Sequence, residues 1–98
     1  MLTLFHVTTA ENAANILHGG FIDGRSKYMT ETELRGVFLS DDPHSEFGTG
    51  VDEAILMVTF NLAPSELADF ELIEEGKPYR EWCIPAAIIR SHASVAFA

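Results

Sequence analysis

A carboxylate begins one of the most apolar segments of the chain, and its position raises a chemical question. The segment reads YREWCIP over residues 79–85, with Glu81 directly ahead of three apolar residues. In a strand, successive side chains alternate between faces, so Glu81 and Cys83 would share one face and Trp82 and Ile84 the other. A glutamate in this position is either solvated at the end of the strand and paired with a neighbouring cation, or placed there for chemistry.

Other side chains of reactive type have simpler explanations. His6 ends the apolar run LTLFH (2–6), where a lone histidine is more often structural, and Phe38 is by type more often a core residue. Cys83 is the one cysteine, and because no histidine is arranged locally to activate it, we expect it in the core. The run DDPH (41–44) lacks a cysteine partner and a spaced second histidine, so it predicts a turn and no metal.

Length and composition predict one domain over residues 1–98. The chain is 47% hydrophobic, which is enough for a single modest core. No apolar run approaches the roughly 20 residues of a membrane helix, and the start lacks a basic region followed by a cleavage site. A single cysteine fits a reducing compartment. We therefore expect a cytoplasmic protein without a membrane segment.

The charge balance limits the partners. Fifteen acidic and six basic residues give a formal charge of -9, which repels phosphate backbones and anionic membranes. An anionic ligand can still bind where cations converge, because screening limits the reach of the remaining charge to about 10 Å. The six cations are Arg25, Lys27, Arg35, Lys77, Arg80 and Arg90.

The hydrophobic pattern predicts an α+β fold that is mainly β, with one clear helix near the N-terminus. Residues 2–7 form a predicted strand, and Thr8 and Glu11 have the spacing of a capping box that starts a helix. Apolar residues then recur at helical spacing until Gly19-Gly20, which favours a helix end.

The remaining elements follow from shorter signals. Residues 36–40 and 70–73 are predicted strands, and 53–62 is predicted to run through the sheet centre because it is too continuously apolar for an edge. Residues 64–69 predict one helical turn. The polar stretch 25–35 is interpreted as a loop, and 88–97 as one or two short strands.

Four of these segments, taken in chain order, resemble the ADP-ribosyltransferase superfamily, in the branch similar to diphtheria toxin and the poly(ADP-ribose) polymerases. LFHVT (4–8) is similar to the family's histidine before a glycine and a serine or threonine. NAANILHGGF (12–21) is similar to the helix that follows it. GVFLSD (36–41) resembles the family's strand G-I-Y-F-A-D, and REWCI (80–84) its strand with the catalytic glutamate. The resemblance covers most of the chain.

The resemblance implies two small packed sheets that form an NAD cleft, and an enzyme that transfers ADP-ribose from NAD to an acceptor. As a glycosyltransferase, toxin-like or regulatory, it would use Glu81 and His6 for catalysis. The implied NAD-binding residues are His6, Val7, Thr8, Arg25, Lys27, Phe38, Ser45 and Phe47. The implied acceptor is an unidentified macromolecule, by expectation a protein, with nucleic acid disfavoured by the acidic balance.

The chemistry gives each residue type a reason. Cleavage between nicotinamide and ribose passes through an oxocarbenium-like state, which the anion of Glu81 would stabilise. His6 would serve a ribose hydroxyl as a neutral donor or acceptor. Phe38 would form a wall, Phe47 would stack on nicotinamide, and Ser45 falls near the family's amide-binding serine. Arg25 or Lys27 would meet the pyrophosphate through charge-assisted hydrogen bonds.

Two departures from the family pattern leave alternatives open. Phe38 stands where the family has tyrosine, and Val7 where it has glycine. One alternative keeps the fold without its chemistry, as a nucleotide-binding or protein-interaction module. Another is an RNA 2′-phosphotransferase or a DNA-modifying transferase, because HVT (6–8) and the helix motif also resemble those groups. The acidic balance and the few arginines argue against the latter.

Overall fold

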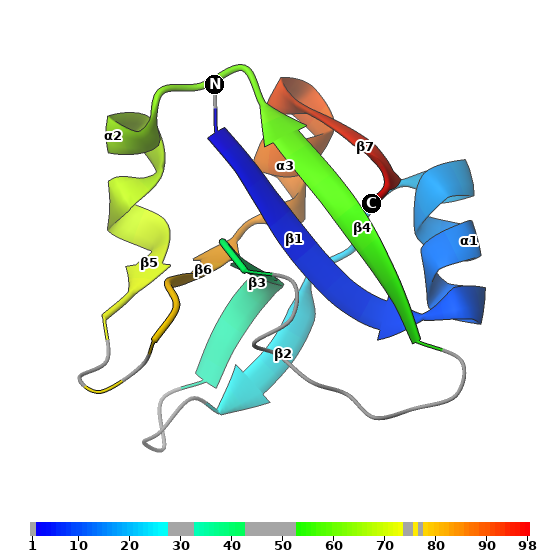
Figure 1. The fold of residues 1–98 in the computed structure, drawn as a ribbon, viewed down its shortest axis with the longest axis horizontal. Helices are drawn as coiled ribbons and strands as arrows, with labels where there is room; N and C mark the ends of the chain where they lie inside the picture. The colour runs from blue at the N-terminus through cyan, green and yellow to red at the C-terminus, as the bar shows by residue number, and fades with distance from the viewer. Residues whose placement is uncertain (1, 28–32, 43–52, 74–75, 77) are drawn as a thin grey trace.

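The computed structural model describes residues 2–27, 33–42, 53–73, 76 and 78–98, with the backbone alone for 24–27 and 33–34. Strands are the commonest elements in these ranges (Figure 1). In chain order the elements are β1 (Leu2–Thr9), α1 (Ala10–Gly19), β2 (Gly24–Lys27), β3 (Glu33–Ser40), β4 (Glu53–Phe60), α2 (Pro64–Leu67), the 3-10 helix η1 (Ala68–Phe70), β5 (Glu71–Leu72), β6 (Glu81–Ile84), α3 (Ala86–His92) and β7 (Ala93–Phe97).

The strands form one antiparallel sheet in the order β5-β6-β3-β1-β4-β7, with β2 paired to β3. The predicted α+β class and the excess of strand are confirmed. β4 lies between β1 and β7, so this continuously apolar segment avoids the sheet edge as expected, although it is next to the edge strand and not at the predicted sheet centre. The expected pair of sheets enclosing an NAD cleft stays a prediction.

β1 pairs along its full length with β4 but at only one described position with β3. β1 pairs with β4 from Leu2 opposite Phe60 to Thr9 opposite Glu53. In the described ranges, β1 and β3 are in register only where Phe5 lies opposite Ser40. Figure 1 shows β1 and β4 running side by side while β2 and β3 leave them in another direction. The sheet therefore opens between β1 and β3 on one side of that pair.

The core lies on the face of the sheet that α1 and α3 cover. Alternation along each strand sends every second side chain to this face. From β1 and β4 these include Leu4, Leu56, Val58 and Phe60, and from β3 and β6 Val37, Leu39, Trp82 and Ile84; the helices add Ala13, Ala86 and Ile89. Full burial of a large apolar side chain contributes about 1.5–3 kcal/mol each, so this face dominates the stability of the fold.

The predicted N-terminal helix is confirmed, but its cap is one residue later than expected. Thr9 is the N-cap, and its hydroxyl accepts a hydrogen bond from the backbone N–H of Asn12 at 3.1 Å. Thr8 lies opposite Ala54 in the β1–β4 ladder. The capping-box prediction was wrong because the strand pairing extends through Thr8.

Two further predictions were wrong. Within 25–35, interpreted as a loop, β2 and the start of β3 pair as antiparallel strands, from Arg25 opposite Arg35 to Lys27 opposite Glu33. β2 is a strand because its backbone pairs with β3, and the hydrophobic pattern of residues 25–35 does not reveal this pairing. Of residues 88–97, predicted to hold one or two short strands, 93–97 form β7, but 88–92 belong to the helix α3. Pro85 stands at its N-cap, and Ala86 and Ile89 bury one helical face, which overrides the β-branched pattern.

Candidate functional site

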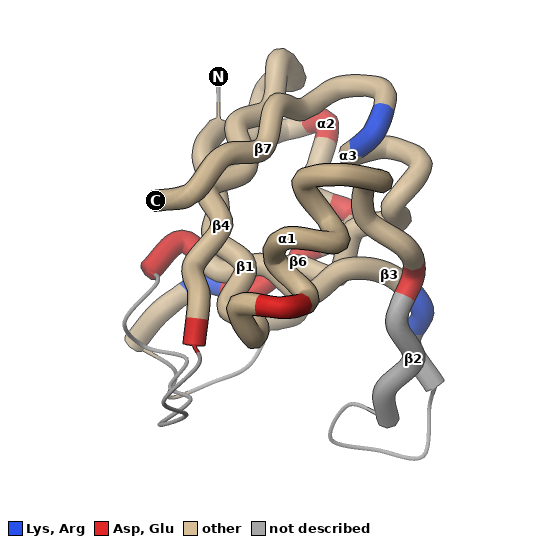
Figure 2. Tube along the Cα trace, turned by 90° about the vertical axis from the view of Figure 1, so that its right-hand side faces the viewer, with Lys and Arg blue, Asp and Glu red and all other residues tan. Residues whose placement is uncertain are grey.

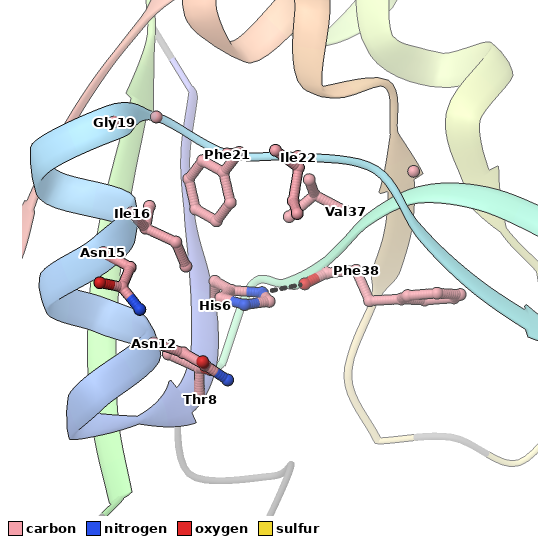
Figure 3. A pocket seen from close by; sticks show the side chains of 12 residues that line it. His6, Thr8, Asn12, Asn15, Ile16, Gly19, Phe21, Ile22, Val37 and Phe38 are labelled. Atoms are coloured by element: carbon pink, nitrogen blue, oxygen red, sulfur yellow. Dashed lines mark hydrogen bonds between the residues drawn. The ribbon is translucent and has the colours of Figure 1, made fainter.

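A pocket of about 550 Å³ lies where the sheet opens, between α1, the end of β1 and the middle of β3 (Figure 3). Its walls come from segments that are distant in sequence. In chain order they are His6, Thr8, Asn12, Asn15, Ile16, Gly19–Ile22 and Gly36–Phe38. The volume is within the range of about 300–1,000 Å³ typical of small-molecule sites. The pocket brings together three of the predicted site residues: His6, Thr8 and Phe38.

His6 is held in a defined orientation within this pocket. Its Nδ1 lies 2.8 Å from the backbone oxygen of Phe38, marked in Figure 3. Because a carbonyl oxygen only accepts, Nδ1 must carry the proton, and Nε2 of the neutral ring is then an acceptor. The ring of Phe21 meets the imidazole edge to face, with centroids 5.2 Å apart and planes at 88°. His6 thus offers one acceptor nitrogen for a ligand.

Burial sets the charge of His6. Removal from water lowers the pKa of His6 below its ordinary value, and the hydrogen bond to Phe38 opposes that shift in part. The ring is therefore neutral at physiological pH. This agrees with the role expected from the sequence, a neutral partner for a hydroxyl group.

Phe38 contributes its backbone carbonyl to the site. Its carbonyl faces His6, whereas its ring points away from His6 (Figure 3). The side chain is half-buried, so it is not a plain core residue. Phe38 lies opposite Cys83 on β6, which places Cys83 beside it on the same face.

Glu81 is buried, with 7% of its surface exposed. It lies opposite Ser40 on one side and Leu72 on the other, inside the sheet. The alternative of a solvated carboxylate at a strand end was therefore wrong. Phe38 is opposite Cys83, and Glu81 is two residues before Cys83 on the same strand. Glu81 is therefore a diagonal neighbour of Phe38 on the same face, and such neighbours are typically about 7–8 Å apart.

Glu81 and His6 do not share a face. Glu81 lies opposite Ser40, and Ser40 lies opposite Phe5, so these three side chains are on one side of the sheet. His6 follows Phe5 and therefore points to the other side. Glu81 is not one of the described residues that line the pocket. A ligand that contacts both Glu81 and His6 must therefore pass between β1 and β3.

The backbone ahead of Glu81 is fixed by its neighbours. Asp41 and Arg80 exchange two hydrogen bonds: the N–H of Arg80 donates to Oδ1 of Asp41 at 2.9 Å, and the N–H of Asp41 donates to the Arg80 oxygen at 3.1 Å. The Arg80 guanidinium binds both carboxylate oxygens of Glu71 and lies 4.9 Å from the centre of the Trp82 ring. The hydrogen bond from Arg80 lowers the pKa of Glu71.

The other predicted binding residues are placed as follows. Val7 lies opposite Ile55 in the β1–β4 ladder and is half-buried, but it is not among the described pocket residues. Arg25 and Lys27 lie on β2, where the backbone alone is described. Ser45 and Phe47 lie outside the described residues.

Sequence reasoning missed most of the residues that line the pocket, among them three with a polar or aromatic side chain. Asn12 and Asn15 project from α1 on the side of His6, as Figure 3 shows, and Phe21 follows the helix. The two asparagines are three residues apart, a spacing that places side chains on one helical face. The sequence signal available was this spacing on the helix that directly follows the strand of His6.

Cys83 is a buried residue, as predicted, and burial raises the pKa of its thiol. In the parts of the chain that the structure describes, no three His, Cys, Asp or Glu residues gather into a group that could hold a metal ion. Within the same residues, no helix has the length and apolar character needed to cross a membrane.

Comparison with known proteins returned no relative. No family model matches the chain, and neither a curated protein nor a solved structure matches it at a significant level.

Proposed function

We propose that this chain binds NAD in the pocket around His6 and transfers its ADP-ribose to a macromolecular acceptor. The observation that carries the proposal is that His6, Thr8 and Phe38 line one pocket although His6 and Phe38 are 32 positions apart in the chain. These residues come from two of the motifs on which the resemblance to the ADP-ribosyltransferases rests, and a chance resemblance would not require them to meet.

The pocket wall has polar groups suited to a nucleoside. Nε2 of His6 accepts a hydrogen bond from a ribose hydroxyl, because Nδ1 is already committed to Phe38. Asn12 and Asn15 supply amide donors and acceptors from α1, and Thr8 supplies a hydroxyl. Apolar surface from Ile16, Phe21 and Val37 covers the flat faces of the ligand.

The opening between β1 and β3 relates this pocket to Glu81. NAD is an elongated ligand, so one nucleoside can occupy the pocket while the nicotinamide ribose passes the free edge of β3 near Phe38. Glu81 lies on that side, as a diagonal neighbour of Phe38. Its anion then stabilises the positive charge that develops on the ribose ring.

The reaction proposed at Glu81 is a substitution at C1 of the ribose. The bond from C1 to the nicotinamide nitrogen breaks, and its electron pair leaves on that nitrogen, which neutralises the pyridinium. The nucleophile of the acceptor forms the new bond to C1 and releases its proton to solvent. We propose a protein acceptor, because the charge of -9 disfavours a nucleic acid.

A binding module without turnover is the second candidate. Two observations favour it: Phe38 lacks the hydroxyl of the family's tyrosine, and Glu81 is absent from the described pocket wall. In this case NAD or a related nucleotide binds around His6 and no bond is cleaved. Nicotinamide release distinguishes this candidate from the enzyme.

Calorimetric titration with NAD at millimolar concentration tests the binding step. We expect wild type to bind, and His6→Ala to bind about 3- to 10-fold more weakly, the effect of one lost hydrogen bond of about 0.5–1.5 kcal/mol. His18→Ala is the matched control, because His18 is exposed on α1 and does not line the pocket. Absence of binding by wild type, or equal losses in both variants, would refute the assignment of the pocket.

A further inference from the structure

Residues 20–23, here called the strap, leave the end of α1 and cross between the pocket and α3 (Figure 3). The strap holds Gly20, Phe21, Ile22 and Asp23, and its first three residues line the pocket. Phe21 is 3% exposed and is the strap residue that contacts His6. The strap is therefore a wall of the candidate site, although none of its residues was among the predicted site residues.

Both ends of α3 fasten the strap. At the start of the helix, Oδ1 of Asp23 accepts a hydrogen bond from the backbone N–H of Ala86 at 2.8 Å. In the last turn, Nη1 of Arg90 donates to the backbone oxygen of Phe21 at 2.7 Å. These two bonds join residues more than sixty positions apart, so α3 determines where the strap lies.

Gly20 gives the Arg90 side chain its path. This glycine has φ of +89°, and a Cβ added to it would lie 3.3 Å from Cδ of Arg90. The Arg90 side chain thus passes over the strap at the one position without a side chain, which brings its guanidinium to the Phe21 carbonyl. The glycine is required both by its backbone angle and by this close approach.

A second cavity lies on the other side of the strap. It has a volume of about 410 Å³ and is lined by Gly20, Phe21 and Arg90 together with residues of α1, α3 and β7. Ile16, Gly20 and Phe21 also line the pocket with His6, so the strap stands between two cavities. Phe21 packs in the hydrophobic core, and on the side of the second cavity the two hydrogen bonds to α3 add to that packing in holding the strap.

The contact of Phe21 with His6 restricts the imidazole ring. Rotation of a histidine ring about χ2 is only loosely restricted by its own geometry. The hydrogen bond from Nδ1 to Phe38 fixes one edge of the ring, and the perpendicular Phe21 ring 5.2 Å away fixes its plane. Loss of either contact would let the ring turn and exchange its donor and acceptor edges.

We infer that the strap is a positioning device for His6, in which Arg90 and Asp23 hold Phe21 so that the imidazole keeps Nδ1–H on Phe38 and presents Nε2 to the ligand. Arg90 and Asp23 are positioning residues, because they act on His6 through Phe21 and do not touch a ligand. The consequence for NAD affinity rests on the proposed function, whereas the consequence for the His6 ring does not.

Nitrogen NMR of the imidazole at pH 8 tests the inference through the tautomer of His6. The key pair is Arg90→Met and Arg90→Lys, because both keep a long aliphatic stem and lysine alone keeps a donor for the Phe21 carbonyl. Signals of His6 are identified by their loss in His6→Gln. Glu66→Ala is the control for destabilisation, because it removes the hydrogen bond that Ala63 donates to Glu66 on α2, away from the pocket lining.

We expect wild type and Arg90→Lys to show one tautomer with the proton on Nδ1, and Arg90→Met to show a mixture. NAD should bind Arg90→Met about 3- to 10-fold more weakly than wild type, as for loss of one hydrogen bond. Asp23→Ala should act like Arg90→Met, which provides a second variant if that one does not fold. Glu66→Ala should melt earlier than wild type with an unchanged tautomer.

An unchanged tautomer in both Arg90→Met and Asp23→Ala would overturn the inference, as would an equal change in Glu66→Ala. The tautomer of His6 tests the positioning by the strap, and NAD binding tests the proposed function. If wild type fails to bind NAD while the tautomer shifts as expected, the proposed function is refuted and the positioning of His6 stands.

Discussion

At the scale of single residues, Glu81 and His6 show what a sequence can predict about a site. Their types and their order along the chain identified both as candidates. The burial of Glu81 was not predictable, because it comes from Ser40 and Leu72 on two flanking strands that are distant in sequence. A polar group held away from water is costly unless it is paired, which makes a buried carboxylate across the sheet from a pocket a candidate for function.

His6 should make the free energy of unfolding depend on pH. Burial lowers its pKa in the folded chain, whereas in the unfolded chain it titrates near the ordinary 6.5. As pH falls below about 6.5, the unfolded chain therefore binds a proton that the folded chain does not, and stability decreases until pH passes the lowered folded pKa. Above that window His6 contributes no slope.

Urea unfolding of wild type and His6→Gln between pH 5 and 8 measures this effect. Glutamine keeps an N–H donor for the Phe38 carbonyl and does not titrate. We expect the difference in stability between the two proteins to be constant above about pH 6.5 and to shift in favour of the variant below it. Carboxylate titrations cancel in that difference. Parallel pH profiles would contradict a buried neutral His6.

At the scale of elements, prediction succeeded where the signal was local. The periodicity and the paired glycines of α1, and the apolar runs of β3, β4 and β6, are visible in short windows. The β2–β3 hairpin and α3 depend on partners elsewhere: β2 pairs with β3, and Asp23 binds the start of α3. The opening between β1 and β3, which forms the pocket, is a matter of register and has no local signal.

Gly36 tests how closely β3 and β6 approach beside the pocket. It has φ of +152°, and an added Cβ would lie 2.9 Å from Sγ of Cys83 and 3.1 Å from the Ile84 oxygen. Gly36→Ala should lower the free energy of unfolding by about 2–5 kcal/mol, from backbone strain and overpacking together. Thermal and urea unfolding measure it.

The matched control is Gly19→Ala, because an added Cβ at Gly19 meets nothing within 4 Å. Alanine at the end of α1 should be neutral or stabilise by up to about 1 kcal/mol. A Gly36→Ala protein as stable as Gly19→Ala would show that β3 and β6 are farther apart than the structure has them.

At the scale of the whole molecule, the account depends on a sheet with two halves. β1, β4 and β7 carry His6, and β3, β6 and β5 carry Phe38 and Glu81; the halves are in register at Phe5 and Ser40. Figure 2 shows acidic residues at several separate points along the described part of the chain.

The central claim is that Glu81 acts on a ribose bound across this opening. It is tested by nicotinamide release from NAD by wild type, Glu81→Gln and Glu66→Gln. Glutamine keeps the size of Glu81 but loses its charge, and Glu66→Gln makes the same chemical change at an exposed residue of α2. NAD affinity should be similar in all three proteins, because the ground-state ribose carries no positive charge for Glu81 to meet.

The account predicts that wild type and Glu66→Gln release nicotinamide at the same rate, and that Glu81→Gln is slower by a factor of about 100 or more. Melting curves of the three proteins verify that each is folded at the assay temperature. Equal release by wild type and Glu81→Gln, or no release by wild type with water or any protein acceptor tested, would contradict it.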